Sequence, residues 1–457
     1  MAVDAETLRE IEEGYEHAVI VFLDRDGYPM SVAAGYRTDL QRGAIVLEAP
    51  AGETAPPEGE VSVVFSHIHP QPEMGYDERR YVTLWGRLHR EGNELEFTPV
   101  RHTSWDEKKV PFFQYSELSV PQAHRYLGEL SRQRGREVKP RLAFGWLFLR
   151  ATRLPFLTAT LIPVLLGVAA AALEGTWSLW LAFLTFLAAA FVHLGLNVAN
   201  DVFDTLSGAD AANTTPTQFS GGSRVIQYGL MSLRTMVLLS AGFYAAGIGI
   251  GLYLAVTRGF WPLFWLGVLG LVISIVYTAP PFRLVHRGVG EITVGLGFGP
   301  IMLLGSYFVQ AQRFSLEAGL LSIPVAILIA LVLYVNEVPD RAGDAAAGKR
   351  TLPVRLSREG VIRGYAGALA VTYTLIGVFA VTGLIARPAI IALATIPIAT
   401  RCVRGLRRDY DDPYALMFST MGKNIQLHLF TGLLLFAGYL IAIGADRLMD
   451  SVPVFLR

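Results

Sequence analysis

Cysteine is nearly missing from this chain, since Cys402 is the only one among 457 residues. A single thiol excludes a disulfide within the chain. Charge is also scarce, at 17% of residues, and the 39 basic and 39 acidic side chains cancel. A neutral chain gives no indication of a nucleic-acid partner. The N-terminus lacks the basic and then apolar start of a secretory signal, so no signal peptide is expected.

What the chain has in excess is apolar residues, at 52% of the total, with a mean hydropathy of +0.40. These values exceed those of ordinary soluble proteins. Their distribution is uneven, because residues 1–140 are charged and mixed, whereas long apolar runs fill residues 154–447. We therefore expect a soluble domain with a basic linker over residues 1–140 and a membrane domain over residues 141–457.

The first domain has the pattern of a small soluble antiparallel β-barrel. A polar helix over residues 1–16 precedes short β-rich runs that alternate with turn signals such as the Asp26–Gly27 pair. Another helix is expected over residues 121–134. The six expected strands cover residues 17–23, 28–34, 44–48, 61–67, 81–89 and 94–97.

The strand order and the turn D-G-Y-P-M-S at residues 26–31 resemble the pyridoxamine-phosphate-oxidase-like split barrel. This resemblance covers only the first domain and implies a flavin-binding fold. Whether the domain binds a flavin, dimerises or is a non-catalytic module stays open. Four polar side chains could face a flavin, although surface positions on the barrel are the simpler interpretation for them: His67, His69, Arg80 and His102.

Nine apolar segments follow, most of them close to the ~20 residues that cross a bilayer. The inner loops carry most arginines and lysines, whereas the outer loops carry only Arg258, Arg313 and Arg387. This bias predicts a multi-pass protein of the cell (inner) membrane with its N-terminus in the cytoplasm and its C-terminus outside. The segments cover residues 154–173, 178–200, 235–256, 260–279, 289–309, 316–336, 361–384, 388–402 and 425–445.

An acidic cluster closes the second apolar segment, where residues 197–210 read N-V-A-N-D-V-F-D-T-L-S-G-A-D. Side chains at i, i+3, i+4 and i+7 share one face of a helix, which groups Asn197, Asn200, Asp201 and Asp204. Carboxylates at the end of a membrane helix need a cation or a polar partner. Oxygen ligands at this spacing suit Mg²⁺, which proteins hold through a few carboxylates and substrate phosphates.

A second acidic cluster closes the sixth segment, where residues 336–351 read N-E-V-P-D-R-A-G-D-A-A-A-G-K-R-T. Asn336, Asp340 and Asp344 also share one face if this stretch is helical, and Pro339 predicts a kink or a helix start. Each cluster ends an apolar helix and is followed by basic residues. We therefore expect one cytoplasmic site in which the two clusters bind metal ions that hold a diphosphate.

These motifs resemble the UbiA superfamily of intramembrane aromatic prenyltransferases, over roughly residues 145–447. They are most similar to its menaquinone-branch members, which prenylate dihydroxynaphthoate. The resemblance implies an all-α transmembrane bundle of nine helices and Mg²⁺-dependent transfer of a polyprenyl group from a polyprenyl diphosphate to an aromatic acceptor. Further matching stretches are F-S-G-G-S-R-V-I-Q (219–227), Y-T-A-P-P-F-R-L (277–284) and G-V-G-E-I-T-V-G-L-G-F-G-P (288–300).

The resemblance and the residue types together assign the ligands of the diphosphate and its metal ions. The metal ligands are oxygen-bearing side chains of the two clusters: Asn197, Asn200, Asp201, Asp204 and Asp210 in the first, and Asn336, Asp340 and Asp344 in the second. The phosphate ligands are basic side chains and glycines that admit backbone N–H groups: Arg224, Lys349, Arg350, Gly221 and Gly222.

The aromatic chemistry is assigned to a second set. Tyr277 is expected to face the allylic cation through its ring. An acidic acceptor is expected to be oriented by Arg283, His286 or Arg287. The long isoprenoid tail needs only an apolar groove open to lipid.

Simpler interpretations stand beside these roles. Arg224, Lys349 and Arg350 could serve solely to set the orientation of the chain in the membrane, and Tyr277 could belong to an interfacial aromatic belt. For His193 and His428, hydrogen bonds in the core are favoured over metal binding, and the glycine-rich stretch 288–299 favours close helix packing over a phosphate loop. Other acceptors, such as hydroxybenzoate, stay open. So does a cation-coupled membrane carrier, although the basic residues beside both clusters argue against it.

Overall fold

The computed structural model describes residues 3–451 apart from residues 25, 49–54, 71–75, 93 and 141. The chain forms two compact units, Met1–Ser116 and Glu117–Arg457. The first is an antiparallel sheet domain and the second is helical, which confirms the expected fold class. The sequence places the boundary at residue 140, whereas helix α2 (Phe112–Arg134) lies with the second unit from Glu117 onward.

The sheet domain contains one antiparallel sheet with the strand order β2-β1-β5-β6-β7-β4-β3. Six strands match the six expected runs, and β3 is an addition that pairs with β4 at one edge. Leu8 and Ile11 of helix α1 pack against the apolar face of the sheet. The elements are α1 (Ala5–Gly14), β1 (Ala18–Leu23), β2 (Pro29–Ala34), β3 (Tyr36–Asp39), β4 (Ala44–Glu48), β5 (Gly59–Pro70), β6 (Tyr76–Glu91) and β7 (Glu94–Asp106).

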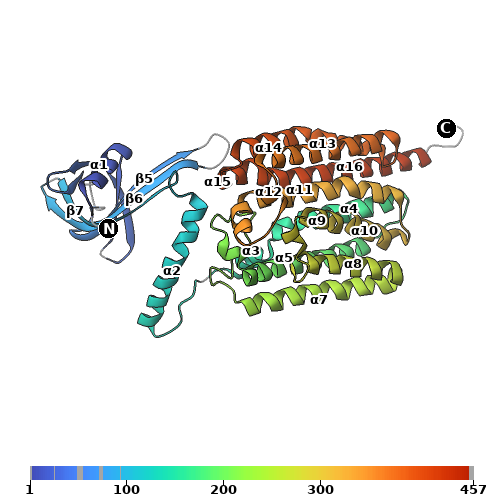
Figure 1. Ribbon diagram of the computed structural model, residues 1–457, viewed down its shortest axis with the longest axis horizontal. Coiled ribbons are helices and arrows are strands. Elements are labelled where there is room, and N and C mark those ends of the chain that lie inside the picture. The colour runs from blue at the N-terminus through green and yellow to red at the C-terminus, as the bar shows by residue number, and fades with distance from the viewer. Residues whose placement is uncertain are drawn as a thin grey trace. The chain divides into compact units, whose positions relative to one another are not determined.

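The helical unit is that of a multi-pass membrane protein (Figure 1). In the described part of the chain, nine helical stretches are long and apolar enough to cross a membrane, and they match the nine expected segments. The spans are η1 and α4 (Leu154–Leu173), α5 (Leu179–Ser207), α7 (Leu233–Arg258), α8 (Phe260–Thr278), α9 to α10 (Gly290–Ala311), α11 (Leu316–Ala346), α13 (Arg358–Thr382), η4 and α14 (Arg387–Asp409), and α15 to α16 (Pro413–Asp446).

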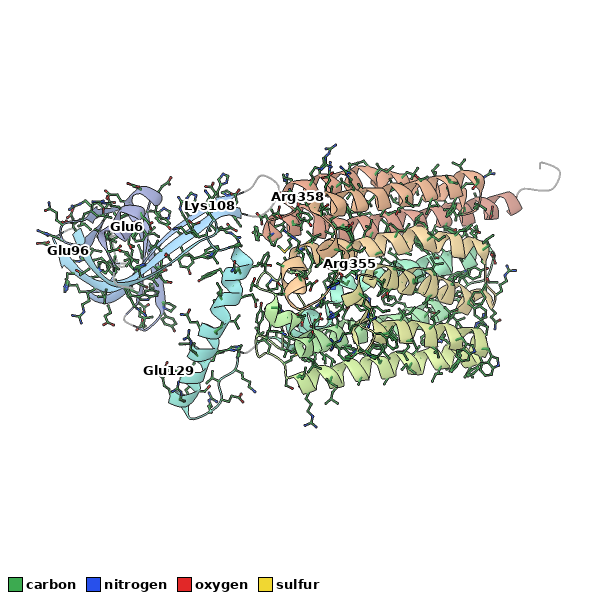
Figure 2. The ribbon with its side chains drawn as sticks, in the orientation of Figure 1. Glu6, Glu96, Lys108, Glu129, Arg355 and Arg358 are labelled. Carbon is green, nitrogen blue, oxygen red and sulfur yellow. The ribbon has the colours of Figure 1, made fainter. Side chains whose placement is uncertain are left out.

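Short helical segments connect these spans. The eighth span begins as the 3-10 segment η4 (Arg387–Thr395), and the larger rise of a 3-10 helix, about 2 Å per residue, lets a shorter apolar run cover the same distance. The connecting segments are α3 (Phe144–Thr152), α6 (Ala209–Ala212), η2 (Leu284–Arg287) and α12 (Leu352–Arg355). Arg355 of α12 and Arg358 at the start of α13 lie at one end of the bundle (Figure 2).

Local sequence signals fix where the spans start and stop. Four of them begin at a serine whose hydroxyl accepts a hydrogen bond from a backbone N–H three residues later, namely Ser178, Ser232, Ser315 and Ser357. Helix α5 ends at Gly208, which adopts the left-handed conformation (φ +78°). Helix α11 continues through Pro339 to Ala346, so the helix start predicted at that proline is wrong.

The spans differ in how much of them the protein covers. The central span α11 is 56% buried, whereas α7 and α8 are only 17% and 11% buried. Figure 1 shows α7 and α8 side by side at one edge of the bundle. The glycine-rich stretch packs closely as expected, because a Cβ at Gly299 would come within 2.4 Å of Ala326 Cβ on α11.

Candidate active site

The first acidic cluster lies at the end of α5 and in α6. Helix α5 runs past its apolar stretch to Ser207, so Asn197, Asn200, Asp201 and Asp204 occupy one helical face. The chain then turns at Gly208 and presents Asp210 from α6. All three carboxylates are buried, with 2–7% of each residue exposed. Such burial requires compensating partners or cations.

The second acidic cluster lies at the end of α11. Because the helix is unbroken, Asn336, Asp340 and Asp344 stay on one face. The structure brings this face against the first cluster, and both line one cavity of about 180 Å³, which we call the polar cavity. The cluster residues in its lining are Asn197, Asn200, Asp204, Asp210, Asn336, Asp340 and Asp344.

A loop from the first cluster ties the two clusters together. The amide of Asn213 donates to Asp340 Oδ1 at 2.8 Å, and the backbone N–H of Gly221 donates to Asp340 Oδ2 at 2.8 Å. Ser223 N–H lies 3.2 Å from both oxygens of Asp201. This loop therefore places backbone and amide donors between carboxylates that are more than a hundred residues apart in sequence.

The two glycines of the loop line the polar cavity, as expected. Both have positive φ, +71° at Gly221 and +77° at Gly222, a conformation that glycine adopts without strain. A Cβ at Gly222 would come within 2.9 Å of Asp210 Oδ1. A larger residue would therefore push the loop off the first cluster.

Lys349 lies between the two clusters. Its Nζ is 2.9 Å from Asp204 Oδ1 and 3.7 Å from Asp344 Oδ1, and the residue is buried. Burial alone would lower the pKa of Lys349, but the neighbouring carboxylates outweigh burial and raise it above its ordinary value. The ammonium group is thus held charged inside the polar cavity.

Arg153 is a lining residue that the sequence reasoning missed. Its Nη2 lies 2.8 Å from Asp201 Oδ1, and its Nε is buried with no hydrogen-bond partner among the described residues. The only signal in the sequence is its position directly before the first apolar segment. Its guanidinium can donate to further oxygen atoms in the cavity.

The other predicted phosphate ligands point elsewhere. The guanidinium of Arg224 is buried against the backbone carbonyl of Asp210 and the carboxylate of Glu117 on α2. Arg350 is exposed, and its backbone N–H donates to the carbonyl of His286. Neither side chain lines the polar cavity. Of the three basic residues proposed from sequence, Lys349 is the one in its wall.

The charge balance of the polar cavity favours cations. Burial first, and then the charges of Asp204 and Asp201, raise the pKa of Asp210 to about 8. Asn336 Oδ1 is buried and has no hydrogen-bond partner in the described structure. An oxygen without a donor beside crowded carboxylates is a suitable ligand for a hard cation.

A complete metal site is not preformed. In the described part of the chain, no group of three or more His, Cys, Asp or Glu side chains is placed to hold a metal ion. Mg²⁺ usually binds proteins through one or two carboxylates and completes its shell with waters and substrate phosphates. The carboxylate and amide oxygens of the polar cavity therefore fit Mg²⁺ that is shared with a diphosphate.

Tyr277, at the end of α8, is buried and lines the polar cavity. The two arginines predicted to orient an acceptor do not line it. Arg287 is exposed and donates to the carbonyl of Pro281, and Arg283 begins the η2 turn with φ +44°. Burial, and then the charge of Lys349, lower the pKa of His286 to about 4, so this ring is neutral at pH 7.

Two buried glutamates were also missed. Glu337 of α11 lines the polar cavity, and Glu291 of α9 is buried with it. Each has one carboxyl oxygen without a hydrogen-bond partner among the described residues. The sequence placed both in matching motifs, but only the packing of α9 against α11 brings them together.

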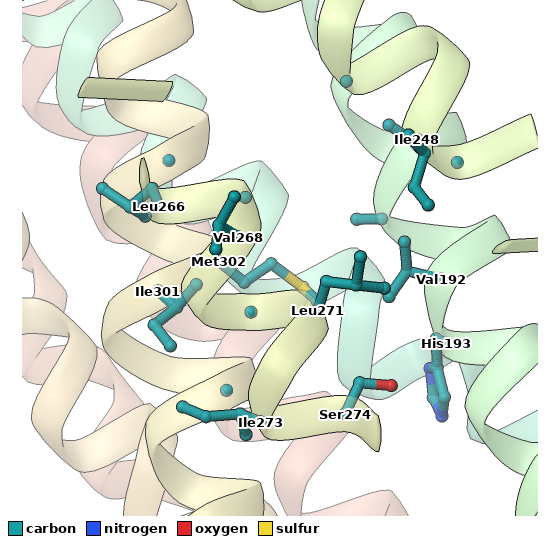
Figure 3. Close-up of a pocket in the computed structure, with 18 of the residues that line it drawn as sticks. Val192, His193, Ile248, Leu266, Val268, Leu271, Ile273, Ser274, Ile301 and Met302 are labelled. Carbon is teal, nitrogen blue, oxygen red and sulfur yellow. The ribbon is translucent and has the colours of Figure 1, made fainter. Parts of the chain in front are cut away.

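A second, larger cavity of about 320 Å³ adjoins the first (Figure 3). We call it the apolar cavity, because α5, α7, α8, α9, η3 and α10 line it almost entirely with hydrocarbon. Its wall includes Val192, Leu271 and Met302 (Figure 3). It shares five wall residues with the polar cavity: His193, Leu196, Tyr277, Val294 and Phe298.

His193 has the core role that the sequence favoured. Its Nδ1 is 2.8 Å from the hydroxyl of Thr160 on α4, and its ring meets Phe298 edge-on with 4.6 Å between centroids. This hydrogen bond joins two spans and fixes the ring where the two cavities meet. His428, also buried, has no hydrogen-bond partner for its Nε2 among the described residues.

Comparison with known proteins gives one family. The sequence profile of the UbiA prenyltransferase family matches residues 160–443. The 1,4-dihydroxy-2-naphthoate octaprenyltransferase of Bacillus subtilis is 25% identical over 316 residues, which cover 69% of this chain and 99% of that protein. The 2-carboxy-1,4-naphthoquinone phytyltransferase of a Synechocystis species is 28% identical over 301 residues, 64% of this chain and 92% of that protein.

Solved structures were compared as well. A UbiA homolog from Archaeoglobus fulgidus, determined bound to GPP and Mg²⁺, aligns with a TM-score of 0.48 at 17% identity. The alignment covers 65% of this chain and 99% of that one.

Proposed function

Because this chain belongs to the UbiA prenyltransferase family, we propose that it transfers a polyprenyl group from a polyprenyl diphosphate to an aromatic acceptor. The acceptor is of the dihydroxynaphthoate type, as the names of the relatives suggest. This places the reaction in menaquinone biosynthesis. The observation that carries the proposal is one polar cavity that is walled by both acidic clusters and shares five wall residues with an apolar cavity.

The reaction begins when the allylic C–O bond breaks and its electron pair leaves with the diphosphate. A ring carbon of the acceptor then bonds to the allylic carbon, and this ring carbon loses its hydrogen as a proton, or its carboxylate as CO₂, while the electron pair of the broken bond returns to the ring. The protein must therefore stabilise a growing negative charge at one end of the donor and a positive charge at the other.

The negative end belongs in the polar cavity. Asp204, Asp210, Asp340 and Asp344, with the amide oxygens beside them, would hold Mg²⁺ there, and bound Mg²⁺ neutralises the charge on the leaving diphosphate. Lys349 and the free Nε of Arg153 add donors for phosphate oxygens. Asp201 would be the remaining metal ligand of the first cluster. It already forms an ion pair with Arg153 and accepts a hydrogen bond from the backbone N–H of Ser223.

The positive end belongs at the junction of the two cavities. Tyr277 faces both of them, so its ring can lie beside the allylic carbon while the tail extends into the apolar cavity. Burial of the junction keeps water from capturing the cation.

Replacement of Tyr277 by leucine should lower turnover roughly 30-fold, whereas phenylalanine should keep most activity. A role only in an interfacial belt would make both variants near normal.

The test uses the full-length protein purified in detergent with Mg²⁺, octaprenyl diphosphate and 1,4-dihydroxy-2-naphthoate. We expect release of diphosphate together with a prenylated product that mass spectrometry can identify. Hydroxybenzoate in place of the naphthoate distinguishes the alternative acceptor. No product with either acceptor, combined with cation-dependent flux in proteoliposomes, would instead support a cation-coupled carrier.

The orientation and the first domain complete the proposal. We propose that the polar cavity lies on the cytoplasmic side of the cell membrane, because arginine and lysine are concentrated in the loops at that end of the spans. Flavin binding by the first domain, residues 1–140, is a separate proposal, which rests on the strand pattern. An absorbance spectrum of the purified full-length protein tests it, since a bound flavin makes the protein yellow and a colourless preparation contradicts it.

A further inference from the structure

The apolar cavity is long rather than round. Its lining on α8 runs from Tyr277 at the junction to Leu263 near the opposite end of that helix. Fourteen residues of α helix rise about 21 Å. On α10 the lining reaches Val309, close to the end of its span. A chain that starts at Tyr277 therefore has a path along most of the membrane thickness.

Two glycines leave this path open at the same depth. Gly251 of α7 and Gly267 of α8 both line the apolar cavity, and a Cβ at either one would meet no atom within 4 Å. Each lies eight residues from Gly259, where the chain passes from α7 to α8. Both are therefore about 12 Å along the helix axes from that turn, and Gly267 is about 15 Å from Tyr277.

We propose that Gly251 and Gly267 determine the length of isoprenoid chain that the enzyme accepts. The proposal deepens the function proposed above and depends on it. The first isoprene units of the donor fill the cavity between the junction and these glycines. Later units pass between α7 and α8 at the depth of these two glycines, where neither position carries a side chain. Larger residues at either position close this passage and leave the inner part of the cavity intact.

Two neighbouring glycines of α7 differ from Gly251, because one has no open space for a side chain and the other lies outside the lining of the apolar cavity. Gly247 also lines the apolar cavity, but a Cβ there would come within 2.8 Å of Val192 Cγ2 and 3.0 Å of the Ala188 carbonyl. Gly247 is thus required for packing against α5. Gly249 has open space and is exposed, but it does not line the cavity. It supplies a matched control on the same helix.

The experiment compares Gly251→Leu, Gly267→Leu and the control Gly249→Leu with the unmodified protein. Leucine has a higher helix propensity than glycine, so the substituted helix, α7 or α8, is expected to form in each of the three variants. Each protein is assayed with geranyl diphosphate and with octaprenyl diphosphate at saturating acceptor. The measured quantity is the ratio of kcat/KM for the long donor to kcat/KM for the short donor.

We expect both cavity variants to lower this ratio at least tenfold, because a pocket that cannot hold part of a substrate discriminates by about that factor or more. Turnover of geranyl diphosphate should stay within about threefold of the unmodified protein and so report on folding. The control should leave the ratio unchanged. An unchanged ratio in both cavity variants overturns the proposal, as does an equal fall in the control.

Failure of this inference can be told apart from failure of the proposed function. If the unmodified protein transfers neither donor, the proposed function is wrong. If it transfers both and the cavity variants keep its ratio, only the assignment of the two glycines is wrong. Should one leucine variant lose geranyl transfer as well, Gly251→Ala and Gly267→Ala provide smaller steps along the same series.

Discussion

The two acidic clusters carry similar side chains but are stabilised in different ways. In the first, Asp201 and Asp204 each lie within 3 Å of a cationic group, from Arg153 and Lys349 respectively. In the second, Asp340 accepts hydrogen bonds from two neutral donors, the Asn213 amide and the Gly221 N–H. Neutral donors stabilise a carboxylate without cancelling its charge, so Asp340 keeps its negative charge for a cation, whereas Asp344 shares the ammonium of Lys349 with Asp204.

This difference explains why one loop matters to both clusters. The loop is anchored to the second cluster through Asn213 and to the first through Ser223. It therefore fixes the separation of the two carboxylate groups before any substrate arrives. Groups that are positioned in advance cost less reorganisation in the transition state.

The largest effect is expected when one carboxylate of either cluster is neutralised. Asp204→Asn and Asp340→Asn should each lower kcat/KM by about 10³-fold or more, because a diphosphate then lacks part of its cation site. Glu359→Gln, which changes an exposed carboxylate paired with Arg363, is the control and should be near normal. Wild-type rates in either aspartate variant would remove the metal assignment, and loss of a thermal unfolding transition would indicate misfolding instead.

The shared cation between the clusters gives the next effect. Lys349→Met removes the ammonium that bridges Asp204 and Asp344 and should lower kcat/KM by roughly 10²-fold. Arg350→Met, at the adjacent exposed position, should change it by less than about threefold. Equal effects at the two positions would mean that both charges act only on membrane orientation, which a protease-accessibility assay in vesicles would measure.

The smallest effect is expected from the neutral donor. Asn213→Ala leaves one oxygen of Asp340 without its amide partner and should destabilise the fold by about 1–2 kcal/mol. Activity should fall roughly tenfold, because the distance between the clusters is less well fixed. A loss as large as that of Asp340→Asn would show that the amide itself contacts substrate, and no loss would show that the loop is held by its other bonds.

Much of the membrane domain could be predicted from the sequence, because its signals are local. Apolar runs gave the spans, and helical spacing placed Asp201 with Asp204 and Asp340 with Asp344 on shared faces. The sheet was less predictable, since the short polar strand β3 carries no clear alternation. Of the kink or helix start expected at Pro339, the helix start is excluded, because α11 runs through that residue without a break.

The partners of the site residues could not be predicted in the same way. Arg153 and Asn213 lie in connecting segments, where nothing local indicates which carboxylate they will meet. For Arg224 the local sequence was misleading. This basic residue lies beside the first cluster in the chain, but its guanidinium pairs with Glu117 and does not line the polar cavity. Each of these contacts joins segments far apart in the chain, so its geometry depends on the assembled bundle.

The low coverage of helices α7 and α8 has a consequence for how the enzyme should be handled. Only 11% of the residues in the apolar stretch of α8 are buried in protein, so acyl chains contact many of the others. Part of the boundary around the donor's tail is then made of lipid. Thinner or thicker bilayers should alter the preference among donors, even though no residue of the protein has changed.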